Sequence, residues 1–117
     1  IPHIVVVNLG TNDFSTRPYP PSILFRNYYL AFLQFIYRIY PEVDIICLTS
    51  DKEPLRSLIS DIVKQEKEQG NDRIHFFEYD PIPTHERGCD WHPNTVAHKK
   101  IAIKLAAKME KILERRF

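Results

Sequence analysis

The sequence has 117 residues, enough for one small domain. Hydrophobic residues make up 44% and charged residues 26%, which is typical of globular proteins and argues against a disordered or collagen-like chain. The formal net charge is +1 and the basic residues form no stripe, so we expect no nucleic-acid partner. No apolar run is long enough to cross a bilayer, so we expect no membrane partner either.

The first third of the sequence predicts a strand, a loop and a helix. Residues 4–9 are a nearly continuous run of β-branched residues, typical of a strand buried on both faces of a parallel sheet. Gly10 ends this strand, and residues 10–21, rich in Gly, Asn, Asp, Ser and Pro, predict a loop. With Ser22 as its N-cap, a helix is predicted over residues 23–40. It is apolar over a wide arc, so it needs burial on more than one side.

The remaining sequence continues the alternation of strands and helices. We expect strands at residues 43–49 and 74–79, a helix at residues 55–69, a loop at residues 80–92, and a last helix at residues 94–115 with Pro93 in its first turn. Strand–helix repeats with short connections imply parallel strands and right-handed crossovers.

The predicted sheet has only three strands, which leaves its first strand at an edge. Residues 4–9 are too apolar for a solvent-exposed edge, which invites aggregation. In a flavodoxin-like strand order 2-1-3-4-5, the three strands would fit positions 3, 4 and 5. We therefore expect a missing N-terminal segment, or another chain, to pair with residues 4–9.

Two motifs lie where ligand sites form in open α/β sheets, beyond the carboxyl ends of strands. Gly-Thr-Asn-Asp at residues 10–13 follows the first predicted strand, and Cys-Asp-Trp-His-Pro at residues 89–93 precedes the last helix. Gly-x-Asn-Asp followed by Asp-x-His-Pro in this context resembles blocks III and V of the SGNH (GDSL) hydrolases. The fuller strings, at residues 8–15 and 88–94, resemble carbohydrate esterase family 2 in particular.

This resemblance implies a three-layer α/β/α, flavodoxin-like SGNH fold, of which residues 1–117 would be the C-terminal portion. It implies a serine esterase that removes acetyl groups from polysaccharides or small acetylated sugars, without a metal or other cofactor, and favours a secreted or extracellular location. The family's serine lies in a Gly-Asp-Ser motif, which this sequence lacks. We therefore expect the chain to be inactive on its own.

The same resemblance implies roles for individual residues. Asn12 would be an oxyanion-hole donor and His92 the general base and acid. Asp90 is one position closer to the histidine than the acid of the usual Asp-x-x-His block. It would either orient His92 or cap the last helix, and the sequence leaves both open. Gly10 and Trp91 would contact substrate, although Trp91 could instead be a buried anchor of its loop.

Other interpretations of the site residues carry less weight. Asp13 is expected to brace its loop by accepting backbone N–H groups. One such interpretation makes Cys89 a nucleophile with His92 as its base. The two residues are nearly adjacent in the sequence, whereas nucleophile and base normally come from different segments. A zinc site of Cys89, His92 and His85 lacks a reliable spacing. The alternative function is a non-catalytic carbohydrate-binding or interaction fragment.

Overall fold

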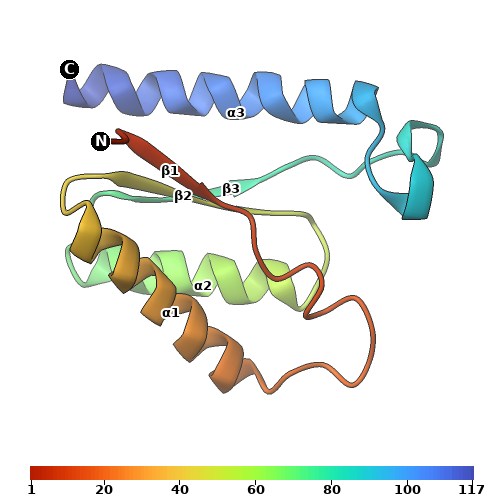
Figure 1. Ribbon diagram of the computed structural model, residues 1–117, viewed down its shortest axis with the longest axis horizontal. Helices are drawn as coiled ribbons and strands as arrows, with labels where there is room; N and C mark the ends of the chain where they lie inside the picture. Colours follow the sequence, from red (N-terminus) through yellow and green to blue (C-terminus); the bar gives the residue numbers. More distant parts are fainter. The chain divides into compact units, whose positions relative to one another are not determined.

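The computed structural model describes residues 1–117, which divide into two compact units, Ile1–Glu78 and Tyr79–Phe117. The first unit holds a sheet of three parallel strands in the order β1-β2-β3, with two helices (Figure 1). Its elements are β1 (Ile4–Val7), α1 (Ser22–Ile39), β2 (Asp44–Thr49), α2 (Leu55–Glu68) and β3 (Ile74–Glu78). The predicted α/β class, element order and parallel pairing are thus confirmed.

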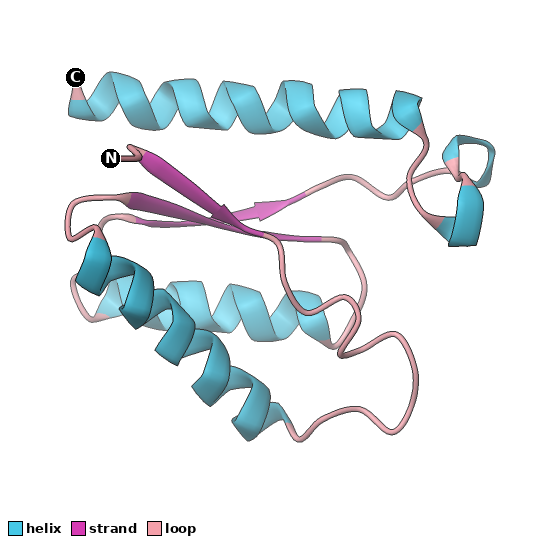
Figure 2. Cartoon of the chain, viewed as in Figure 1, coloured by secondary structure: helices cyan, strands magenta, loops and turns pink.

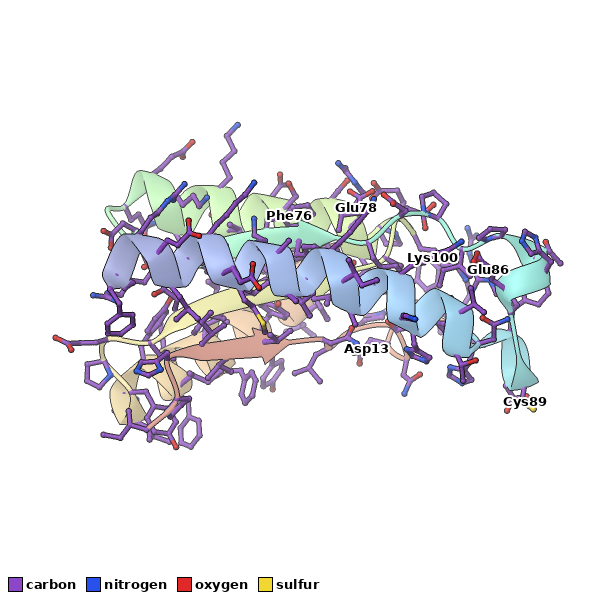
Figure 3. All side chains as sticks on the ribbon, turned by 90° about the horizontal axis from the view of Figure 1, so that it is seen from above. Asp13, Phe76, Glu78, Glu86, Cys89 and Lys100 are labelled. Carbon is purple, nitrogen blue, oxygen red and sulfur yellow. The ribbon has the colours of Figure 1, made fainter.

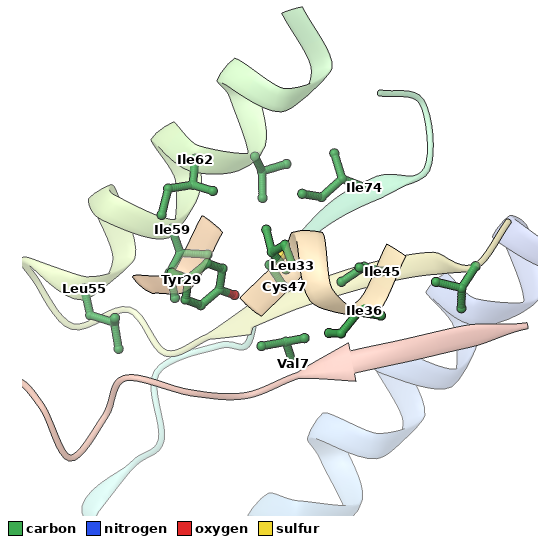
Figure 4. Packing of buried hydrophobic residues seen from close by; sticks show 12 residues of the cluster. Val7, Tyr29, Leu33, Ile36, Ile45, Cys47, Leu55, Ile59, Ile62 and Ile74 are labelled. Carbon is green, nitrogen blue, oxygen red and sulfur yellow. The ribbon is translucent and has the colours of Figure 1, made fainter. Parts of the chain in front are cut away.

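One face of the sheet carries both helices of this unit, as Figure 2 shows. The central strand β2 is paired on both sides and is buried at all six positions. In the register of the sheet, Ile45 of β2 lies between Val5 of β1 and Ile74 of β3. The core between sheet and helices is aliphatic (Figure 4) and includes Val7, Tyr29, Leu33, Ile36, Val43, Ile45, Cys47, Leu55, Ile59, Ile62, Val63 and Ile74.

The strand β1 is an edge strand, paired only with β2. It is shorter than the predicted residues 4–9, and only Val7 among its four residues is buried. The expectation of burial on both faces is therefore wrong for this strand, and its second edge has no partner strand in this chain.

Helix α1 has the wide apolar arc that its sequence predicts. One side packs in the core through Tyr29, Leu33 and Ile36. A second stripe at helical spacing is exposed and consists of Leu24, Tyr28, Phe32, Phe35 and Ile39. We call these five residues the outer stripe. The helix begins at Ser22 with Pro21 as its cap, so the prediction of Ser22 as N-cap is wrong by one residue.

The second unit comprises two short 3-10 helices, η1 (Thr84–Glu86) and η2 (Cys89–Trp91), followed by α3 (Thr95–Arg116). Asn94 caps α3, since its side-chain Oδ1 accepts the Ala97 N–H at 3.0 Å. The interpretation of Asp90 as the cap is therefore wrong, and Pro93 precedes the helix instead of lying in its first turn. None of the helices has both the length and the apolar character that a membrane span requires.

Candidate active site

The turn after β1 begins at Gly10, which is buried and has a φ of +112°. A Cβ atom at this position would lie 2.5 Å from Leu55 Cδ1 and 3.0 Å from Phe25 Cζ. Only glycine combines this backbone conformation with so close an approach to the core. The structure thus gives Gly10 a packing role, while its predicted contact with substrate stays a prediction.

Backbone groups close the turn that carries Asn12. The Asn12 carbonyl accepts the Ser15 hydroxyl at 2.9 Å, and the Phe14 N–H donates to the Gly10 carbonyl at 3.3 Å. Phe14 anchors the turn through an edge-to-face contact with Phe25, with ring centroids 5.0 Å apart. The Asn12 side-chain amide takes no part in these bonds and is exposed. It therefore has both N–H groups available for a ligand.

Asp13 lies on the same turn and is exposed (Figure 3). Its carboxylate accepts no backbone N–H group, so the predicted bracing role is wrong. Ser15 uses its hydroxyl to close the turn. Ser50, at the carboxyl end of β2, is nearly buried and accepts the Lys52 N–H at 3.3 Å. Both serines thus have local structural roles.

A short backbone pairing closes the loop that carries His92. Arg87 and Pro93 form an antiparallel bridge, flanked by bonds from Gly88 N–H to the His92 carbonyl at 2.6 Å and from Asn94 N–H to the Glu86 carbonyl at 2.8 Å. We call the enclosed residues 88–92 the histidine loop. Cys89 lies toward its tip in Figure 3.

An ion pair fixes the base of the histidine loop. Glu86 is buried, with 3% of the residue exposed, and its carboxylate bonds to the Lys100 ammonium on α3 (Figure 3). A buried carboxylate without a partner would be costly, so this pair ties η1 to the second turn of the helix. Together with the Asn94 cap, it joins the loop to the start of α3.

The structure brings Asp90, Trp91 and His92 together on the histidine loop, all of them exposed. The His92 imidazole makes no hydrogen bond, and none joins it to the Asp90 carboxylate. Trp91 is 56% exposed, so its interpretation as a buried anchor is wrong. Both Asp90 and Trp91 have left-handed backbone conformations, with φ of 52° and 63°. Such conformations in non-glycine residues concentrate at functional sites.

The other histidines and cysteines behave differently. His75 is buried and its Nε2 lies 2.9 Å from Asp44 Oδ1, at the amino ends of β2 and β3 and so at the end of the sheet opposite the turn that follows β1. Cys47 is fully buried, and burial raises the pKa of its thiol to about 11. His85 is exposed on η1. No group of three or more His, Cys, Asp or Glu side chains in the chain could hold a metal ion.

Sequence patterns did not reveal the side chains that support the histidine loop. Arg87 contacts Trp91 through its guanidinium, and Glu86 pairs with Lys100, 14 positions away. No motif includes these three residues. Their roles depend on how the loop folds back on itself, which spacing alone does not predict.

The chain as a whole is similar to proteins of known function. No model of a protein family matches the chain. Among curated proteins, the Cellulase/esterase CelE of Acetivibrio thermocellus is 30% identical over 118 residues, which cover 94% of this chain and 14% of that protein. Among solved structures, a family two carbohydrate esterase from Clostridium thermocellum in complex with cellohexaose is 29% identical, with a TM-score of 0.90 over 97% of this chain and 37% of that one.

A second solved structure agrees. A carbohydrate esterase family 2 enzyme with a carbohydrate binding domain, from Corynascus thermopiles (Myceliophthora fergusii), is 26% identical, with a TM-score of 0.81 over 97% of this chain and 38% of that one. The chain thus spans only a fragment of the proteins it matches. The resemblance inferred from the two motifs is confirmed: over nearly its whole length, this chain is similar in sequence and in α/β fold to part of the carbohydrate esterase family 2 proteins.

Proposed function

We propose that this chain is the part of a serine esterase that supplies the oxyanion-hole donor and the general base for removing acetyl groups from carbohydrates. One observation carries the proposal. The Asn12 amide and the His92 imidazole are both exposed and free of hydrogen bonds, on two loops of a chain similar to carbohydrate esterases. A side chain that held its loop by hydrogen bonding would be bonded within the loop, so neither group has that role, and both can bond to a ligand.

The chemistry follows from the two groups. A serine hydroxyl attacks the acetyl carbonyl while the His92 imidazole takes the hydroxyl proton. Negative charge then develops on the former carbonyl oxygen, and the Asn12 N–H groups donate hydrogen bonds to it. His92 gives its proton to the leaving sugar oxygen. Water, deprotonated by the same imidazole, releases acetate from the acyl-serine and restores both groups.

The nucleophile in this proposal comes from outside residues 1–117. The sequence contains no Gly-Asp-Ser, and the hydroxyl groups of Ser15 and Ser50 form local hydrogen bonds. The open edge of β1 and the outer stripe of α1 offer a surface for a further segment, since an apolar edge and an apolar helix face both favour burial. The matched solved structures are much longer than this chain, which is consistent with such a segment.

We propose that His92 works without an acidic partner. No hydrogen bond joins Asp90 to His92, so His92 acts in this proposal without depending on that carboxylate.

Trp91 provides the contact with the sugar, because an exposed indole offers an apolar face to a pyranose ring. Cellohexaose in the complex of the Clostridium thermocellum relative supports a carbohydrate ligand here.

The decisive experiment compares aryl-acetate hydrolysis by residues 1–117 and by the complete gene product. We expect turnover only by the complete product, and a loss of about 100- to 1000-fold in kcat for its Asn12→Ala variant. Asn27→Ala is a matched control, because Asn27 is an exposed asparagine on α1. Strong turnover by residues 1–117 alone would refute the external serine.

A second candidate function is non-catalytic carbohydrate binding. The exposed Trp91 and the cellohexaose complex of the relative favour it. Titration calorimetry with cellohexaose distinguishes the two functions. Binding by the complete gene product that Trp91→Ala abolishes, without any aryl-acetate hydrolysis, would support binding over catalysis.

A further inference from the structure

We propose that Arg87 is a positioning residue that holds Trp91, and through it the backbone of His92. The inference rests on the proposed function only in that it takes His92 as the base. It concerns a side chain that the two motifs do not include, since Arg87 precedes the histidine loop.

Arg87 makes two contacts with Trp91, at opposite ends of that residue. Its Nη1 donates a hydrogen bond to the Trp91 carbonyl at 2.9 Å. Its guanidinium carbon lies 5.3 Å from the centroid of the indole ring, within the range of a cation–π contact. The same side chain therefore fixes the backbone and the ring of Trp91.

The bonds around His92 show why the backbone contact matters. The peptide group before His92 is held by two bonds, from His92 N–H to the Cys89 carbonyl at 3.0 Å and from Arg87 to the Trp91 carbonyl. The peptide group after His92 is held by Gly88 N–H. Of these three bonds, only the one from Arg87 is made by a side chain, so it is the one that a substitution can remove.

The loop also needs this support. Asp90 and Trp91 are consecutive non-glycine residues with left-handed backbones, a conformation that persists only where the surroundings impose it. Neither side chain buries itself, because both are exposed. Arg87 is the one side chain that bonds to the backbone of this strained pair.

The chemistry of arginine suits the task better than that of lysine. A planar guanidinium can stack flat over a ring while it donates in its own plane to a carbonyl, whereas an ammonium has no flat face to stack and sits on a more flexible stem. Arg87 forms no ion pair with any carboxylate, so nothing competes for it. With Arg87 over the indole, Trp91 is held in one orientation while it remains 56% exposed to a ligand.

The test uses Trp91 as its own probe, because it is the only tryptophan of the sequence. Fluorescence anisotropy and acrylamide quenching of residues 1–117 report the mobility of the indole without any need for catalysis. We expect Arg87→Ala to lower the anisotropy and increase quenching, and Arg87→Lys to give intermediate values. Lys104→Ala is the control, since Lys104 forms an exposed ion pair with Asp80 away from the loop.

Kinetics of the complete gene product then connect the loop to the chemistry. We expect Arg87→Ala to lower kcat on an aryl acetate by about 100-fold, the effect of misplacing a catalytic group by roughly 1 Å, and Lys104→Ala to leave kcat within about twofold. The melting temperature should be the same for both variants. Because an aryl acetate lacks the sugar, a fall in kcat there reflects His92 and not the contact of Trp91 with substrate.

Three outcomes decide the matter. Unchanged anisotropy and quenching in Arg87→Ala would overturn the proposal, whatever the activity. A mobile indole with full kcat would overturn the link to His92. If the unsubstituted complete product hydrolyses no ester, the proposed function fails, and the fluorescence comparison of Arg87→Lys with the parent chain still decides whether Arg87 holds the loop.

Discussion

Replacing Gly10 with alanine separates two costs that the turn after β1 avoids. At φ of +112°, any L-residue is strained, and the new Cβ would lie 2.5 Å from Leu55 Cδ1, a buried core atom. Gly70→Ala is the matched control. Gly70 has a φ of +99°, but a Cβ there would meet nothing within 4 Å. The two variants thus share the backbone strain and differ in the clash.

The magnitudes follow from these geometries. A left-handed backbone costs an L-residue about 1–2 kcal/mol, which is what we expect for Gly70→Ala. Overpacking a core adds about 1–3 kcal/mol, so Gly10→Ala should lower the free energy of unfolding by about 2–5 kcal/mol. A small domain has only about 5–15 kcal/mol of stability, so the second loss is a large fraction of the total.

Urea unfolding followed by far-UV circular dichroism measures both values on the same protein. The informative quantity is the difference between the two variants, because the strain common to both cancels. Neutral surface substitutions change the free energy of unfolding by up to about 0.5 kcal/mol. If Gly10→Ala and Gly70→Ala differed by no more than this, Leu55 and Phe25 would not confine Gly10.

Four further predictions concern individual side chains. Asn12→Ala should leave the free energy of unfolding within about 0.5 kcal/mol in urea, because its exposed amide makes no bond. Asp90→Asn in the complete gene product should keep kcat within about tenfold, whereas a true triad acid would cost about 10,000-fold. Thiol titration with a disulfide reagent should find Cys89 reactive and Cys47 protected until the chain unfolds. Because burial raises the pKa of Cys47 to about 11, its contribution to stability should be complete below pH 9 and fall as the pH rises through 11.

Much of the fold was predictable because its signals are local. The apolar runs and helical stripes identify all three strands and all three α-helices, and Gly and Pro residues mark the loops between them. The errors lie at element ends. Ser22 is the first helical residue and Pro21 the N-cap, and the strand predicted to include residues 8 and 9 ends at Val7. End positions depend on tertiary pairing, which the local sequence does not encode.

The candidate site was predictable in its motifs but not in its supports. The strings around Asn12 and His92 indicate which residues carry chemistry, because their spacing relative to strands and helices is characteristic. The left-handed pair at Asp90 and Trp91, and the guanidinium of Arg87 that holds it, arise from a loop closed by backbone bonds. Such contacts leave no periodic trace in the sequence.

The central claim is that this chain brings the base and the oxyanion donor to a serine that lies outside residues 1–117. The most direct measurement is to label the complete gene product with a fluorophosphonate, which reacts with activated serines, and to locate the modified residue by mass spectrometry. We predict one labelled serine outside residues 1–117, with labelling lost in His92→Gln. A label on Ser15, Ser50 or any other serine of this chain would contradict the account.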